Sequence, residues 1–84
     1  MIDAKNVEKL VSRKTELLAE TNVYIAIGDF ISSNMDRCKN ERNYSEWQAW
    51  IDALNDVNMK LKKINDEMED IAEQLDRMVK KIEV

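Results

Sequence analysis

The sequence predicts an all-α protein built as an antiparallel hairpin of two long helices. Its 84 residues include one glycine and no proline, and 36% are charged, which favours long uninterrupted helices. Apolar residues in the second half of the chain step by three and four without a break, which is a coiled-coil signature. A matching seven-residue repeat occupies the first half. We therefore expect residues 1–84 to form a single helical-hairpin domain.

The first helix is expected to run from about residue 3 to residue 38. Asp3 can cap its first turn, and Ile2 and Val7 have the spacing of a hydrophobic staple. The apolar repeat of this helix consists of Leu10, Leu17, Tyr24, Ile31 and Cys38.

A turn is expected at residues 39–45. This segment is polar, and it contains Asn40 and Asn43, which tolerate the left-handed conformation that often ends a helix. Ser45 is followed three residues later by Gln48, a capping-box pair that predicts the start of the next helix.

The second helix is expected to run from about residue 46 to residue 82, with one continuous apolar seam. The seam consists of Trp47, Trp50, Leu54, Val57, Leu61, Ile64, Met68, Ile71, Leu75, Met78 and Ile82. Folding the chain at the turn opposes Leu10 with Leu75, Leu17 with Met68, Tyr24 with Leu61, Ile31 with Leu54, and Cys38 with Trp47. The two residue numbers add up to the same total in every pair, as a single antiparallel register requires. Cys38 is therefore expected to be buried.

Apolar residues beside the seam predict that the hairpin self-associates. The candidate residues are Val11, Leu18, Val23, Ile25, Ile27, Gly28, Phe30, Ile51 and Val79. One partner helix cannot cover all of them, so we expect a homodimer that forms a four-helix bundle, with Gly28 allowing a neighbouring backbone to approach closely. The alternative is that these residues dock a different protein.

Composition argues against several other classes of function. A net charge of −4 does not favour direct binding of nucleic acid or of an anionic membrane. The chain has no histidine, no phosphate-binding glycine loop and no cysteine pair, so we expect no enzyme, metal site or cofactor. A lone cysteine, the lack of an apolar leader at the start and the lack of a membrane-spanning window predict a cytoplasmic protein.

Two further sets of residues are candidates for binding an unidentified protein partner. Tyr44, Trp47 and Trp50 gather large aromatic side chains near the turn. Asp66, Glu69, Asp70 and Glu73 belong to an acidic segment of the second helix. That segment is expected to be a solvated outer face, supported by pairs four residues apart: Lys62 with Asp66, Lys63 with Glu67, Glu73 with Arg77, and Asp76 with Lys80.

These features predict a non-enzymatic protein–protein interaction or assembly module that acts as a homo-oligomeric hairpin. One alternative is a small acidic inhibitor of the phage anti-defence type, such as an anti-CRISPR, that blocks a nucleic-acid-binding protein. A second alternative follows from Trp47-Gln48-Ala49 near the turn, where the outline resembles the small type VII secretion substrates with a Trp-x-Gly turn. Ala49 stands in place of that glycine, and Trp47 falls inside the expected helix. This resemblance would imply a secreted hairpin.

Overall fold

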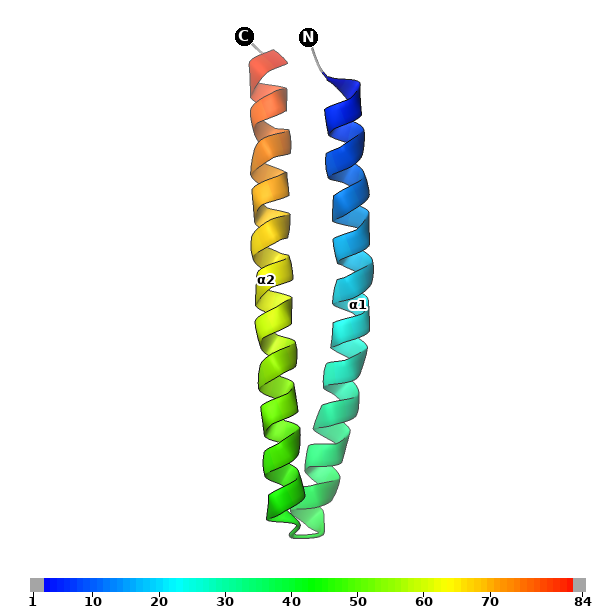
Figure 1. The fold of residues 1–84 in the computed structure, drawn as a ribbon, viewed down its shortest axis with the longest axis vertical. Helices are drawn as coiled ribbons and strands as arrows, with labels where there is room; N and C mark the ends of the chain where they lie inside the picture. Colours follow the sequence, from blue (N-terminus) through cyan, green and yellow to red (C-terminus); the bar gives the residue numbers. More distant parts are fainter. Residues whose placement is uncertain (1–2, 83–84) are drawn as a thin grey trace.

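Two long helices lie side by side in antiparallel orientation (Figure 1). The computed structural model describes residues 3–82, with α1 at Ala4–Asn40 and α2 at Tyr44–Ile82. They form a rod of 63 × 16 × 14 Å with a radius of gyration of 18.9 Å, where a globular chain of this length would have about 12 Å. The predicted all-α hairpin is confirmed.

The start of α1 follows the predicted capping pattern. The Asp3 carboxylate accepts hydrogen bonds from the backbone N–H groups of Lys5 at 3.1 Å and Asn6 at 3.4 Å. These bonds satisfy two of the donors that a helix leaves free at its N-terminus. Ile2, the other half of the predicted staple, lies outside the described residues.

The predicted seam forms the interface between the helices. Along α2, every seam residue from Trp47 to Met78 is buried or half-buried, and the side chain of Ile82 lies outside what the structure describes. Leu17, Ile64 and Ile71 form a buried cluster, against which Leu10, Tyr24, Met68 and Leu75 pack. Both members of two predicted pairs, Leu10 with Leu75 and Leu17 with Met68, are in this group, in agreement with the predicted register.

A second column of α1 residues, spaced seven apart from Val7 onward, also faces the seam. This column contains few apolar residues. Val7, Thr21, Gly28 and Met35 are half-buried there, while Lys14 in the same column is exposed. The hairpin consequently buries few side chains: among the described residues, the buried apolar ones are Leu17, Ile31, Cys38, Val57, Ile64 and Ile71.

The turn is shorter than predicted. Only residues 41–43 lie between the helices, so α1 extends to Asn40 and α2 begins at Tyr44. Arg42 has a φ of 58°, and its N–H bonds the carbonyl of Lys39 while the N–H of Asn43 bonds the carbonyl of Cys38. This pair of bonds is a Schellman motif. The left-handed residue is thus Arg42, and the prediction that an asparagine would adopt this conformation was wrong.

The predicted cap of the second helix was also wrong. Asn43 precedes the first helical residue, and its side-chain oxygen accepts a hydrogen bond from the N–H of Glu46 at 3.3 Å. Ser45 lies inside the first turn of α2 and is exposed. Because the Schellman motif reverses the chain within three residues, the cap falls at Asn43, two positions earlier than the predicted cap at Ser45.

Candidate interaction surfaces

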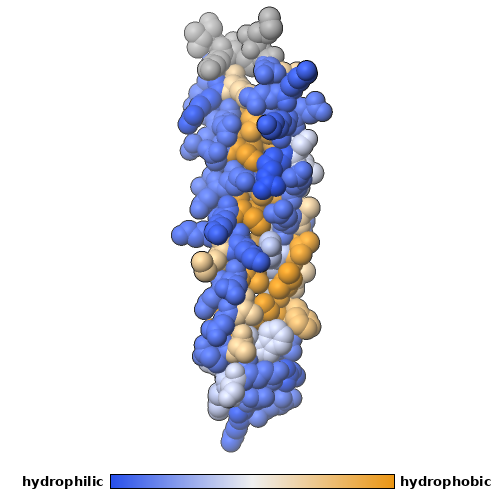
Figure 2. All heavy atoms as spheres, viewed as in Figure 1, coloured by the Kyte–Doolittle hydropathy of each residue, from blue (hydrophilic) through white to orange (hydrophobic). Residues whose placement is uncertain are grey.

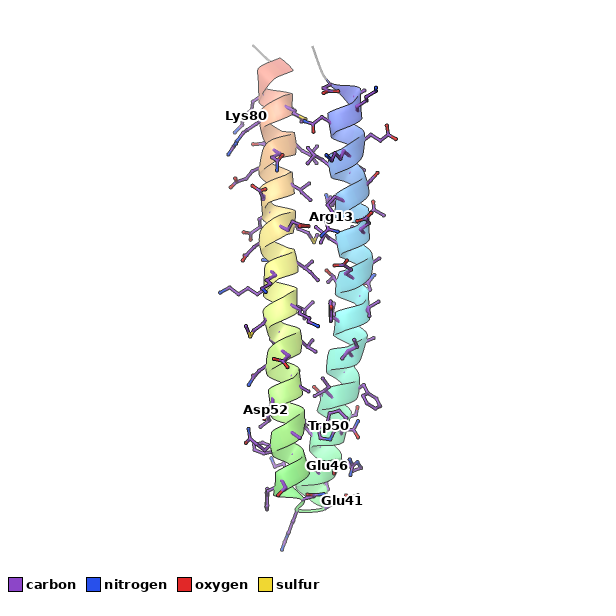
Figure 3. The ribbon with its side chains drawn as sticks, viewed as in Figure 1. Arg13, Glu41, Glu46, Trp50, Asp52 and Lys80 are labelled. Atoms are coloured by element: carbon purple, nitrogen blue, oxygen red, sulfur yellow. The ribbon has the colours of Figure 1, made fainter. Side chains whose placement is uncertain are left out.

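The hairpin has two broad sides, and its cross-helix contacts define one of them. On this side Arg13 of α1 donates from Nε to Glu67 Oε2 of α2 at 2.8 Å, and Arg37 donates to Glu46 Oε1 at 2.8 Å. Lys60 lies over the Tyr24 ring, 5.5 Å from its centroid. Figure 3 shows Arg13 between the two helices on this side. We call it the ion-pair face.

The predicted self-association residues divide between the two sides. Val11, Leu18 and Ile25 each follow a seam residue of α1 and lie about 100° further round the helix, whereas Arg13 and Arg37 lie on the opposite side of the seam. Ile51 and Val79 likewise each follow a seam residue of α2 by one position. In two antiparallel helices, residues turned in the same direction away from the seam lie on the same side of the pair. Ile51 and Val79 therefore share the side of Val11, Leu18 and Ile25. Val23, Ile27 and Phe30 lie with the ion-pair face.

The side opposite the ion-pair face carries two rows of residues spaced seven apart, and these rows lack charge except for Lys39, at the end of the α1 row beside the turn. We call the uncharged residues of these rows the uncharged face; they are Ala4, Val11, Leu18, Ile25 and Ser32 on α1, and Tyr44, Ile51, Asn58, Asn65, Ala72 and Val79 on α2. In a chain that is 36% charged, such rows are unexpected for a solvated surface. Val11, Leu18 and Ile25 are each nearly half exposed.

The apolar residues of the ion-pair face form a smaller patch beside the turn. The rings of Phe30 and Trp50 meet edge to face, with centroids 5.8 Å apart and an interplanar angle of 76°. Phe30 is nevertheless 63% exposed, and Val23 and Ile27 extend the patch along α1. Figure 2 shows this patch widening the apolar band over the half of α1 nearer the turn.

A group of polar side chains at the turn converges on Glu46. Its Oε2 accepts hydrogen bonds from Cys38 Sγ at 3.1 Å and from Asn43 Nδ2 at 3.2 Å, in addition to the Arg37 bond at Oε1. Trp50 lies beside Glu46 (Figure 3), and its buried Nε1 has no hydrogen-bond partner among the described residues. The group fastens the end of α1 to the start of α2.

The same contacts explain how the groups at the turn titrate. The Arg37 guanidinium, with help from the Cys38 thiol, holds the pKa of the Glu46 carboxyl down at about 2. Burial raises the pKa of the Cys38 thiol, and the hydrogen bond to Glu46 raises it further. Cys38 is fully buried, as predicted, and its thiol is kept protonated.

The acidic residues proposed for partner binding lie away from the seam. Asp66, Glu69, Asp70 and Glu73 are all exposed. Two of the four predicted i,i+4 pairs form, Glu73 with Arg77 and Asp76 with Lys80. Glu67 instead accepts hydrogen bonds from Arg13 of the other helix. Residue spacing along one helix cannot predict this contact.

The aromatic candidates near the turn have different environments. Trp47 and Trp50 are half-buried in the seam, and Trp50 also contacts Phe30. Tyr44 is 64% exposed at the first residue of α2. Only Tyr44 therefore offers most of its side chain to a partner.

Gly28 has room around it. A methyl group at its Cα would meet no atom of the hairpin within 4 Å, and its φ is not positive. Neither packing within the hairpin nor backbone conformation therefore requires glycine at this position, although glycine inside a helix costs about 1 kcal/mol relative to alanine. Close packing against something outside the hairpin would account for it.

Other types of site find no support in residues 3–82. No group of three or more histidine, cysteine, aspartate and glutamate side chains is placed to hold a metal ion there. Neither described helix is long and apolar enough to cross a membrane. Comparison with protein-family models, curated proteins and solved structures found no match to this chain.

Sequence reasoning missed the polar members of the uncharged face. Ser32, Asn58 and Asn65 are polar, so a search for apolar residues passes over them. The signal that finds them is the absence of charge at every seventh position from residue 4 to residue 32 and from residue 44 to residue 79. The cross-helix pairs of Arg13 and Arg37 were missed because they depend on how the two helices are rotated about their axes.

Proposed function

We propose that this chain is a non-enzymatic protein–protein interaction or assembly module that works as a self-associated helical hairpin. The observation that carries the proposal is its surface. The hairpin exposes 6642 Å², whereas a folded monomer of 9.9 kDa exposes about 5,200 Å². The excess of about 1,400 Å² per copy is more than the roughly 800 Å² per partner of a standard protein interface.

The distribution of apolar side chains supports the same conclusion. Exposed large apolar residues recur along the hairpin, including Val11, Leu18 and Ile25 on one side of α1 and Val79 on the same side of α2. An isolated two-helix hairpin leaves each helix with a single neighbour, whereas a four-helix bundle gives each helix at least two. Association with another copy would supply the core that the hairpin lacks.

Sedimentation equilibrium over a range of concentrations tests the proposal. The proposal predicts a mass of about twice 9.9 kDa at micromolar concentrations and above, with helix content that falls on dilution. A chain that stays at 9.9 kDa and fully helical at every concentration would refute self-association.

A further inference from the structure

We propose that two copies of the chain pair through their uncharged faces, about a two-fold axis perpendicular to the helices that passes close to Leu18 and Asn65. This inference rests on the proposed function and specifies its geometry. In this arrangement α1 packs antiparallel to α1 of the second copy, α2 packs antiparallel to α2, and the two turns lie at opposite ends of the dimer.

Charge selects the face. Each copy carries a net charge of −4, so a contact that places further like charges against one another at its centre would be disfavoured. The central part of the uncharged face brings no charge of its own into the contact, and the neighbouring column of α1 adds Lys14, whose long side chain can carry its ammonium group to solvent. The ion-pair face would instead bury Arg13 and Glu67, whose bonds are complete within one hairpin. Burying charged groups is costly, so the uncharged face is the one suited to a second copy.

Symmetry within the uncharged face selects the axis. A two-fold axis at Leu18 pairs Leu18 with itself and Val11 with Ile25, so the apolar residues of α1 meet apolar residues. On α2, an axis at Asn65 pairs Ile51 with Val79, Asn58 with Ala72, and Asn65 with itself. In the predicted pairs of the hairpin, the two residue numbers add up to 85, so residue 67 lies opposite residue 18. Leu18 and Asn65 therefore lie near the same level of the rod. One axis therefore serves both helices.

The other face-to-face arrangement has an axis parallel to the helices and is less favourable. It would place α1 over α2 of the second copy, with Leu18 near Asn65 and Ile25 near Asn58. An amide buried against an aliphatic side chain loses its hydrogen bonds to water without replacement. In the perpendicular arrangement, Asn65 meets the same residue of the second copy, and a buried asparagine pair is a known means of fixing register. Asn58 then meets Ala72, which is smaller than the Leu18 and Ile25 side chains that the two asparagines would face in the other arrangement.

Residues around the contact fit the same axis. It brings Lys62 opposite Glu69 of the second copy, twice by symmetry, at the margin of the contact along α2. It also brings Val7 opposite Gly28 of the second copy, and the space at Gly28 is open. On α1 the axis brings Glu8 toward Asp29 of the second copy, at an exposed margin where salt screens like charges.

Disulfide trapping tests the axis. Leu18→Cys should yield a cross-linked dimer under mild oxidation, because its sulfur lies beside the same sulfur of the second copy. Val79→Cys is the matched control, since Val79 is similarly exposed on the same face but lies opposite Ile51 of the second copy. The unaltered chain, whose thiol at Cys38 is buried, reports the background.

Sedimentation of two further variants tests the face. Leu18→Asp should weaken self-association at least about tenfold, because two carboxylates would meet at the axis, whereas Phe30→Asp on the ion-pair face should leave it unchanged. Circular dichroism at high concentration checks that both variants fold.

The possible results separate this inference from the proposed function. Cross-linking of Leu18→Cys well above Val79→Cys, together with selective loss of dimer in Leu18→Asp, supports the inference. A dimer that persists in Leu18→Asp, or that cross-links equally at both cysteine positions, overturns the inference and leaves the proposed function standing. An unaltered chain that is monomeric at every concentration overturns both.

Discussion

Arg42 occupies the one left-handed backbone position among the described residues that are not glycine. A side chain in this conformation costs roughly 1 kcal/mol, and glycine avoids the cost while keeping both Schellman hydrogen bonds. Arg42→Gly should therefore raise the free energy of unfolding by about 0.5–1 kcal/mol, measured by denaturant unfolding. Lys39→Gly, inside the last turn of α1, is the control and should lower it by about 1 kcal/mol. Destabilisation by Arg42→Gly would contradict the assigned turn.

Glu46 makes stability depend on pH through its contacts with Arg37 and Cys38. Because the pKa of its carboxyl is about 2 in the folded chain and about 4.5 ordinarily, its contribution is present above pH 4.5 and is lost as pH falls toward 2. Glu46→Gln should lower the unfolding temperature at neutral pH and flatten its decline over that interval. Circular dichroism melts from pH 2 to pH 7 measure both effects. Glu73→Gln, at an exposed pair, is the control, and an equal flattening there would refute the role of Glu46.

At the scale of single helices, the two leucines at positions 17 and 18 separate the hairpin core from the outer face. Leu17 is 1% exposed and Leu18 is 46% exposed. Leu17→Ala should lower the free energy of unfolding by about 2–4 kcal/mol at any protein concentration, because it opens a cavity inside each hairpin. The effect of Leu18→Ala should instead depend on concentration, because it acts on association. Chemical denaturation at two protein concentrations distinguishes them, and concentration-independent effects of similar size would contradict the two roles.

Both helices and their pairing could be predicted because each depends on a periodic pattern. The seam of α2 and the repeat of α1 are visible in the sequence, and Asp3 was identified as a cap from its position alone. The turn was harder, because three-residue connections with a non-glycine left-handed residue have no strong sequence signature. Asn43 and Ser45 are both good caps, and the choice between them depended on where the chain reversed.

At the scale of the whole molecule, the division of the flanking residues between two faces could not be read from either helix alone. Phe30 and Leu18 are both exposed apolar residues beside the seam, and their different surroundings follow from which side of α2 each one adjoins. Arg13 and Glu67 reveal that side only once the helices are paired. The candidate self-association residues were therefore identified as a group, while their separation into two surfaces required the structure.

Gly28 gives opposite predictions for the single hairpin and for the dimer. Gly28→Ala should stabilise an isolated hairpin by about 1 kcal/mol, since alanine favours the helix and its methyl meets no neighbour. In the proposed dimer the methyl would press against Val7 of the second copy and weaken association. Sedimentation equilibrium and dilute-solution melts measure the two effects separately. A tighter dimer in Gly28→Ala would contradict the proposed contact.

Small-angle X-ray scattering of the unaltered chain tests the central claim most directly. Because the proposed axis lies about four residues from the middle of α1 and about two from the middle of α2, the two copies are offset by about 9 Å along the rod. The proposed dimer has twice the mass of 9.9 kDa and a length of about 72 Å, against 63 Å for one hairpin. A particle of 9.9 kDa, or a dimer no longer than one hairpin, would contradict it.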